Sequence, residues 1–328
     1  MKEKEKEMEM ISLEELVPSN HVYRKFLKLL NFQSISWRLQ RFEKNTSAGA
    51  KGYGMEILFR CLLLQFIEDL SDRELEKMLQ ENNAAKLFCG FGLSEKTPEF
   101  TLFTKTRKKI GAKELGKMFA KMRDQLRAKG FMNEVFNFVD ASHLVSKAAL
   151  WEERDEAIKQ RYEKLNNEVL PKFAKDPQAR FGCKGGKKFW YGYKEHVSVD
   201  MQSGLINKIA ITPGNVTDAQ GFRHITPSQG AVYGDKGYCI KPAREVMEKR
   251  GLHDATIKLN HMKVKDPQKD SWLTKIRAPY ERVFSQRNRR VKYRGVEKNQ
   301  FRAFGRAIAF NLKRLVVLEA YEKGLVLA

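Results

Sequence analysis

The fold of this chain is decided by the stretch Val135-Phe136-Asn137-Phe138-Val139-Asp140-Ala141-Ser142, in which an apolar run typical of a buried strand ends on an acid. A second apolar run, Ala231-Val232-Tyr233-Gly234, ends in the same way at Asp235. Open α/β sheets place their functional sites at the carboxyl ends of strands. We therefore predict that Asp140 and Asp235 each follow a strand, and that Glu281 reaches them from an Arg-rich helix.

Three carboxylates from separate elements suit one kind of chemistry. Magnesium and manganese prefer oxygen ligands, with water and substrate phosphate completing the shell. Two such ions about 3.5–4 Å apart activate a water or hydroxyl and stabilise the leaving oxygen of a phosphodiester. The chain has 40 acidic residues, however, so three acids can be chosen to fit many patterns. An Asp after a strand is also a common turn or helix cap, so both readings stay open.

The charge of the chain predicts a polyanionic partner. There are 62 Lys and Arg residues against 40 Asp and Glu in 328 residues, a formal net charge of +22. Nucleic acid is the first candidate and a membrane surface the second. No segment reaches the roughly 18 uninterrupted apolar residues of a membrane-spanning helix, and no apolar signal-peptide core follows Met1. The four scattered cysteines form no C-x-x-C pair, which argues against a zinc site.

Periodicity divides the chain into two predicted domains. Residues 1–130 read as an all-α domain, with a buried helix over 53–70, a second over 72–80 behind a capping box at Ser71, and a break at Gly111. Residues 131–328 read as an α/β domain with a hairpin over 190–199 and 205–211, short strands at 231–234 and 255–259, and an insertion around 144–188. This order favours a mixed sheet flanked by helices.

Basic residues gather around the proposed acids and in the helical domain. Their density after Glu281 predicts phosphate contacts, although a solvated helix face is the simpler reading. In the first domain, basic residues belong either to a helix-turn-helix-like DNA reader or to the surface of a plain bundle. The residues expected to contact DNA are Arg277, Arg287, Arg289, Arg290, Lys292, Arg294, Lys184, Lys187, Lys188, Lys236, Lys105 and Arg107. Arg277 could instead form an i,i+4 pair with Glu281, and His143 and His196 are expected to be structural.

The acids lie within ordered blocks of sequence. These are Leu70-Ser71-Asp72-Arg73-Glu74-Leu75, Thr97-Pro98-x-Phe100-Thr101-x-Phe103, Val139-Asp140-Ala141-Ser142, Tyr191-Gly192-Tyr193-Lys194-x-His196-x-x-x-Asp200, Thr212-Pro213-Gly214-Asn215-Val216-x-Asp218, Tyr233-Gly234-Asp235-Lys236-Gly237-Tyr238, Ile276-Arg277-x-x-x-Glu281-x-x-Phe284 and Tyr293-Arg294-Gly295. Together they span about residues 50–318 and resemble the Asp-Asp-Glu (DDE) transposases of bacterial insertion sequences.

The resemblance implies a ribonuclease H-like catalytic domain behind a helical N-terminal domain. It implies that Asp140, Asp235 and Glu281 hold two Mg²⁺ or Mn²⁺ ions. It further implies cutting of double-stranded DNA at terminal inverted repeats, joining of the 3′-hydroxyl ends to target DNA, and action in the bacterial cytoplasm on the nucleoid. Because two ends must be moved together, a homodimer is expected in the DNA complex. No membrane partner is expected.

The chain departs from the family pattern at one position. The family often carries a Lys seven residues after the Glu, and here that position is Asn288. Arg287 and Arg289 flank it and could contact the phosphate instead, because arginine binds phosphate in a bidentate manner. The departure keeps two alternatives open: a catalytically inactive DNA-binding protein on the same scaffold, and a metal-dependent endonuclease that cuts without joining.

Overall fold

A computed structural model of the chain describes residues 10–43, 52–147, 166–184, 188–285 and 290–322. Contacts divide the chain into two compact units, Met1–Ile110 with Leu315–Ala328, and Gly111–Arg314. Compact units need not coincide with domains, so the domain boundary near residue 130 stays a prediction. No helix among the described residues is long and apolar enough to cross a membrane.

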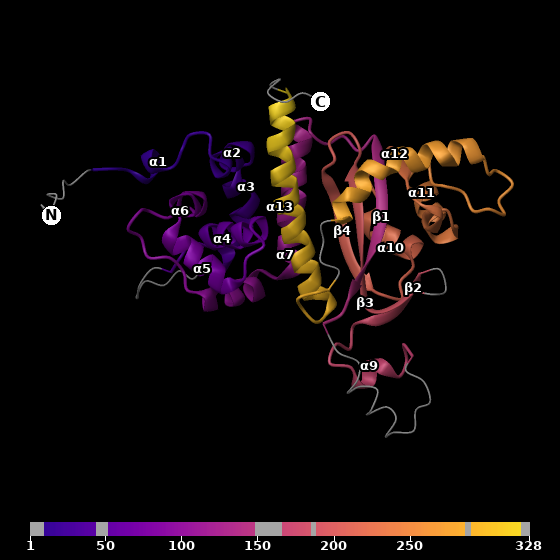
Figure 1. Cartoon of the computed structure of the whole chain (residues 1–328), viewed down its shortest axis with the longest axis horizontal. Helices are drawn as coiled ribbons and strands as arrows, with labels where there is room; N and C mark the ends of the chain where they lie inside the picture. Colours follow the sequence, from indigo (N-terminus) through magenta and orange to yellow (C-terminus); the bar gives the residue numbers. More distant parts are fainter. Residues whose placement is uncertain (1–9, 44–51, 148–165, 185–187, 286–289, 323–328) are drawn as a thin grey trace, which may run out of the picture. The chain divides into compact units, whose positions relative to one another are not determined.

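The first unit is helical, as the sequence predicts (Figure 1). Its elements are α1 (Leu13–Leu16), α2 (Val22–Leu29), α3 (Phe32–Ser36), the 3₁₀ helix η1 (Trp37–Phe42), α4 (Met55–Ile67), α5 (Asp72–Glu81), α6 (Asn83–Cys89) and the start of α7 (Phe100–Ala128). Helix α4 is buried on nearly every side because it is apolar all round. The capping box at Ser71 opens α5, where the Ser71 hydroxyl accepts from the amide of Glu74.

Helix α7 breaks at Gly111, where the sequence predicts a stop. Gly111 has φ 67° and ψ 167°, a conformation that helical residues do not adopt and that glycine tolerates. The two segments predicted on either side of this glycine are therefore present within one element. The part of α7 that follows the break belongs to the second unit, which begins at Gly111.

The second unit is built on one mixed sheet (Figure 1). Its elements are β1 (Phe136–Val145), α9 (Leu170–Phe173), β2 (Arg180–Lys184), β3 (Lys188–Asp200), β4 (Ile206–Pro213), α10 (Asp218–Ile225), β5 (Ala231–Tyr233), the 3₁₀ helix η2 (Lys236–Tyr238), α11 (Lys241–Lys249), β6 (His253–Asp254), α12 (Pro267–Ser285) and α13 (Val296–Glu322). The strand order is β2-β3-β1-β5-β6, with β4 paired to β3. Strands β1, β3 and β4 are antiparallel neighbours, and β5 and β6 run parallel to β1.

This mixed sheet flanked by helices confirms the predicted α/β class and its ribonuclease H-like arrangement. The 255–259 strand is a correction: only His253–Asp254 forms β6. The amides of Ala255 and Ile257 still donate to the carbonyls of Val232 and Gly234, both at 3.1 Å. Residues 255–257 thus continue alongside β5 through hydrogen bonds, although they do not form a strand.

Alternation along the strands assigns the two faces of the sheet to different helices. Val139 and Val232 belong to a buried cluster with residues of α10 and α11, including Phe222 and Met247. Ala231 lies on the opposite face in a second cluster with Leu273 of α12. Because successive side chains of a strand point to opposite faces, Phe138 and Asp140 face α12 while Val139 faces α10. The Phe138 ring packs against the Tyr280 ring of α12, with 5.8 Å between the centroids, which agrees with this assignment.

Helix α13 covers the open edge of β4. The side-chain oxygen of Asn311 accepts from the Ile206 amide at 2.8 Å, and its nitrogen donates to the Ile206 carbonyl at 2.9 Å. Gln300, three turns earlier, accepts from the Ile211 amide at 2.7 Å. Unpaired strand edges invite association with other chains, so these amides both satisfy and protect the edge.

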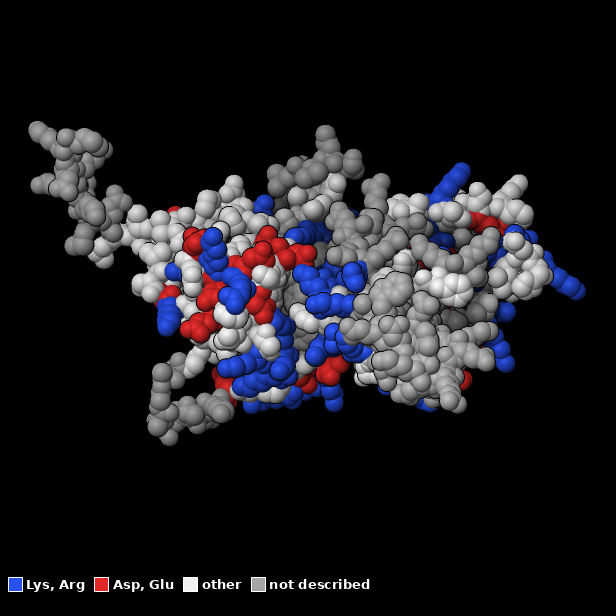
Figure 2. Space-filling model, turned by 60° about the horizontal axis from the view of Figure 1, so that its bottom comes forward, with Lys and Arg blue, Asp and Glu red and all other residues white. Residues whose placement is uncertain are grey.

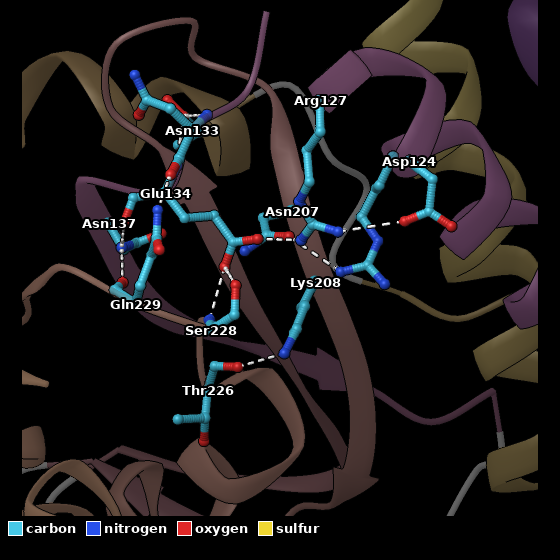
Figure 3. A network of polar contacts seen from close by, with 12 residues as sticks. Asp124, Arg127, Asn133, Glu134, Asn137, Asn207, Lys208, Thr226, Ser228 and Gln229 are labelled. Atoms are coloured by element: carbon cyan, nitrogen blue, oxygen red, sulfur yellow. Dashed lines mark hydrogen bonds and ion pairs between the residues drawn. The ribbon is translucent and has the colours of Figure 1, made fainter. Parts of the chain in front are cut away.

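A polar network fixes the start of β1 (Figure 3). The buried Glu134 carboxylate accepts from the Ser228 amide at 2.6 Å and from its hydroxyl at 2.8 Å, and forms an ion pair with Arg127. Asn137 donates to the carbonyls of Glu134 and Gln229, at 2.7 and 3.0 Å. These bonds tie β1 to the loop that precedes β5, and so help to set the level at which the two strands meet.

Candidate active site

Asp140 and Asp235 lie at the same level of two adjacent parallel strands. The pairing of β1 with β5 ends at Phe138 opposite Tyr233, and each aspartate lies two residues beyond that pair. Asp140 is not at the end of its strand, which corrects the sequence prediction. Strand β1 continues to Val145 because its antiparallel pairing with β3 extends that far. The site is therefore created by the end of β5, which leaves one edge of β1 open beside Asp140.

Each aspartate has one carboxylate oxygen fixed by the backbone. Asp140 Oδ1 accepts from the Ala141 amide at 2.8 Å. Asp235 Oδ1 accepts from the Gly237 amide at 2.8 Å and caps η2. The ideal Cβ position of Gly237 is 3.0 Å from that Asp235 oxygen and 3.3 Å from Asp218 Oδ2. A larger residue at position 237 would press on both carboxylates.

Asp218 is a third carboxylate near this place, and its sequence position alone does not predict a role for it. It is the first residue of α10, where the Thr217 capping box starts the helix. Its Oδ1 accepts from Lys194 Nζ of β3 at 2.7 Å. The signal for Asp218 was its place in one of the ordered sequence blocks, but proximity to Asp235 depends on packing between α10 and η2, which sequence does not show.

The electrostatics of the site are those of crowded carboxylates. Burial, together with the negative charges of Asp235 and Asp218, raises the pKa of Asp140 to about 7. The Ala141 amide and the Arg277 guanidinium act in the opposite direction. A carboxyl group with such a pKa is only partly ionised near neutral pH. A cation placed between these groups relieves the repulsion and favours the ionised form.

Helix α12 approaches Asp140 through Arg277. This arginine is buried, lies 5.6 Å from the ring centroid of Phe138, and stabilises the ionised form of Asp140. Glu281 follows Arg277 by one helical turn on α12. The side chain of Glu281 lies outside the described part of the structure. The backbone thus places Glu281 one turn after the arginine that acts on Asp140, while the charges of Asp235 and Asp218 act on Asp140 directly.

The two histidines of this region differ in environment. His196 is fully buried, and its Nε2 lies 2.8 Å from the Thr212 hydroxyl. Burial lowers its pKa to about 4, so it is neutral at physiological pH. The His143 ring lies 5.2 Å from that of Trp190. His196 is therefore a hydrogen-bonded structural residue, as the sequence predicts.

Comparison with known proteins agrees with this geometry. A family described as “Transposase domain (DUF772)” matches residues 11–109, and one described as “Transposase DDE domain” matches residues 159–312. These two ranges cover more than half of the chain. The chain belongs to the DDE transposases. The second match begins after Asp140, so it does not include that acid, and the catalytic role of Asp140 stays a prediction.

One solved structure is similar to the transposase over most of its length. It is the cryo-EM structure of the piggyBac transposase synaptic complex with hairpin DNA, at 9% identity and a TM-score of 0.43. The alignment covers 94% of this chain and 76% of that chain. A likeness at this level bears on neither mechanism nor assembly.

The donor set of the transposase site fits a hard divalent cation. Among the described side chains, no three His, Cys, Asp or Glu residues lie close enough together to hold a metal ion. The described pair, Asp140 and Asp235, would supply carboxylate oxygens, and the Glu281 side chain would be the third donor. Oxygen ligands of this kind are those that Mg²⁺ and Mn²⁺ prefer. DDE transposases generally use divalent metal ions, which the donor set matches.

The basic residues predicted to contact DNA fall into four groups. Those exposed to solvent are Lys105, Lys184, Lys236, Arg290, Lys292 and Arg294. Arg277 is buried. Arg107 forms an ion pair with Asp72, in which Arg107 Nη1 donates to Asp72 Oδ1 at 2.8 Å. Arg287, Arg289, Lys187 and the neighbouring Asn288 lie outside the described residues, as does the Lys188 side chain. Figure 2 shows that Lys and Arg side chains form several groups on one face of the molecule.

Proposed function

We propose that this transposase cuts insertion-sequence ends at their terminal inverted repeats and joins the 3′-hydroxyl ends to target DNA. The observation that carries the proposal is the placement of Asp140 and Asp235 two residues beyond the last β1–β5 pair. Asp140, Asp235 and Glu281 would hold two Mg²⁺ or Mn²⁺ ions. Bound there, such ions would lower the pKa of the attacking water or hydroxyl and stabilise the leaving oxygen.

The remaining residues of the site hold and orient DNA. Lys236 follows Asp235 directly and is exposed, with its Nζ 3.1 Å from Asn260 Oδ1. Three exposed basic residues come after Glu281 and the end of α12 in the sequence: Arg290, Lys292 and Arg294. With a net charge of +22, the chain would bind the phosphate backbone by releasing counterions. Because two ends must be joined in one event, we propose a homodimer in the DNA complex.

The test is cleavage of a labelled duplex that carries the repeats flanking the gene, with and without Mg²⁺ or Mn²⁺. We expect metal-dependent nicks at the repeat boundary by the wild type and none by Glu281→Ala. Glu248→Ala, which removes an exposed acid from α11, is the matched control and should cut normally. An acceptor duplex in the same reaction tests joining.

The possible outcomes separate the alternatives. Cutting without transfer to the acceptor would identify a metal-dependent endonuclease. Binding without cutting by the wild type, at any metal concentration, would identify an inactive DNA-binding protein. Asn288→Lys, which restores the residue that the family often carries, would then be the first variant to test for activity. Cutting that Glu281→Ala retains would overturn the assignment of the third acid.

A further inference from the structure

Tyr238 is a buried tyrosine beside the three aspartates. It ends η2, three residues after Asp235, and no part of its side chain is exposed. Its ring packs edge to face against Phe222 of α10, with 6.0 Å between centroids. The ideal Cβ position of Gly234 is 3.0 Å from the Tyr238 ring, so the ring is enclosed between the end of β5 and α10.

The Tyr238 hydroxyl is unusual because no described residue hydrogen-bonds to it. Buried hydroxyl groups in proteins are nearly always paired, and an unpaired one destabilises the fold. Tyr193 of β3 shows the usual arrangement. It is equally buried, yet its hydroxyl donates to Asp176 Oδ1 at 2.5 Å and accepts from the Gly295 amide at 3.0 Å.

The surroundings of the Tyr238 hydroxyl are carboxylates. Asp218 precedes Phe222 by four residues, so the two lie on the same face of α10, one turn apart. Asp218 Oδ2 also lies 3.3 Å from the ideal Cβ position of Gly237, the residue that precedes Tyr238. Burial, followed by the charges of Asp218, Asp140 and Asp235, raises the pKa of Tyr238 well above its usual value. The hydroxyl is therefore a neutral donor at all physiological pH values.

The carboxylates have matching free acceptors. The Oδ1 atoms of Asp140, Asp235 and Asp218 each accept a hydrogen bond from a described group. Their Oδ2 atoms have no such bond within the described part of the chain. Asp218 lies one helical turn before Phe222, and Tyr238 packs on the Phe222 ring. Asp218 Oδ2 is therefore the acceptor we consider for Tyr238.

We propose that Tyr238 is a positioning residue whose hydroxyl donates a hydrogen bond to Asp218 Oδ2 when Asp140 and Asp235 hold a divalent cation. The inference rests on the proposed function. Repulsion opposes the close approach of ionised carboxylates, and a cation bound between them removes that repulsion. With Lys194 on Oδ1 and Tyr238 on Oδ2, Asp218 becomes a fixed negative charge beside Asp235. Such hydrogen bonds around metal ligands commonly raise metal affinity.

The test compares two Tyr→Phe variants of the full-length protein, because the change removes one oxygen and preserves shape. Mn²⁺ affinity is measured by titration calorimetry, and stability of the metal-free protein by urea unfolding. We expect Tyr238→Phe to weaken Mn²⁺ binding by about 10-fold while its urea midpoint stays equal or rises. Tyr193→Phe, the matched control, should lower the urea midpoint and leave Mn²⁺ affinity unchanged.

A double-variant cycle identifies the acceptor. Asp218→Asn should weaken Mn²⁺ binding, and adding Tyr238→Phe to it should weaken binding little further, because the two groups act together. Fully additive effects would overturn the pairing with Asp218. Equal Mn²⁺ affinity of wild type and Tyr238→Phe would overturn the positioning role altogether.

Failure of this inference is distinguishable from failure of the proposed function. If the wild type binds Mn²⁺ and Asp140→Asn does not, the metal site stands whatever Tyr238→Phe does. If the wild type binds no Mn²⁺, with or without repeat DNA, both fail together.

Discussion

Lys194 Nζ lies 2.7 Å from Asp218 Oδ1 and joins β3 to the first residue of α10 beside Asp235. Both side chains are largely removed from solvent, at 13% and 28% exposure. The pair places one positive charge next to Asp218, whose own charge acts on Asp140. It thereby limits the repulsion that the site must overcome before a cation binds, and it gives β3 a part in a site otherwise formed by β1 and β5.

Removal of the Lys194 charge should raise the pH at which the site binds a metal ion. In Lys194→Gln the charge of Asp218 is no longer offset, so the pKa of Asp140 should rise from its value of about 7. We expect the pH midpoint of Mn²⁺ binding to move upward, by about 0.5–1 unit. Lys258→Gln is a matched control, because Lys258 pairs with Asp254 at the same 2.7 Å and similar exposure. An equal shift in both variants would contradict a local effect.

Asp140→Asn should separate cutting from binding. Without the carboxylate, cleavage of repeat DNA should fall by at least about 100-fold, because a metal ligand is lost. DNA affinity should stay the same or rise slightly, since a negative charge near the phosphate is removed. Gel-shift and cleavage assays on one duplex measure both. Parallel loss of binding and cutting would argue for misfolding rather than a metal role.

The pKa of Asp140 predicts a pH-dependent stability of the metal-free protein. Its folded-state pKa of about 7 lies above the ordinary 3.8, so the folded protein keeps a proton that the unfolded chain releases. The stability from this group is complete below pH 3.8 and is lost as pH rises toward 7, by at most about 4 kcal/mol. Urea unfolding at several pH values should show this slope in the wild type and not in Asp140→Asn. An unchanged slope would refute the prediction.

Glu134 should show the opposite pH dependence. Burial raises its pKa, but hydrogen bonds from Ser228 and Arg127 outweigh burial and lower the pKa from 4.5 to about 2. Its stabilisation is therefore present above pH 4.5 and is lost as pH falls toward 2. Glu134→Gln should destabilise the protein by about 3 kcal/mol at pH 7, because Arg127 loses a buried partner. Asp124→Asn, which removes the exposed partner of Arg127, should cost less than about 1 kcal/mol.

Arg290 should contribute to DNA binding through phosphate. It is exposed, and it follows α12, where the Val291 amide bonds the Val145 carbonyl at the end of β1, at 2.9 Å. Arg290→Ala should weaken binding of any duplex and reduce the slope of log affinity against log salt by about 1. Lys249→Ala, at the exposed end of α11, should leave the slope unchanged. A slope unaffected by Arg290→Ala would remove this residue from the DNA surface.

The local signals of the sequence were sufficient for most elements. The capping box at Ser71, the glycine break at residue 111 and the β3–β4 hairpin are all present, because each depends on residues close in sequence. Arg107 shows where such signals are insufficient. Its basic neighbourhood predicts a DNA contact, yet its guanidinium is engaged by Asp72, 35 residues away. The DNA role of Arg107 stays a prediction.

Local patterns in the sequence predicted the class of fold, the family, a polyanionic partner and two acids that lie at one level of the sheet. Apolar runs, turn residues and ordered blocks carry that information locally. The tertiary structure was needed to show that Asp140 lies inside its strand, that Asp218 lies near Asp235, and that Lys194 pairs with Asp218. The length of β1 is set by its pairing with β3, more than 40 residues later in the chain, and the place of Asp218 by the packing of α10 on η2. Both are contacts between distant segments, which no local pattern specifies.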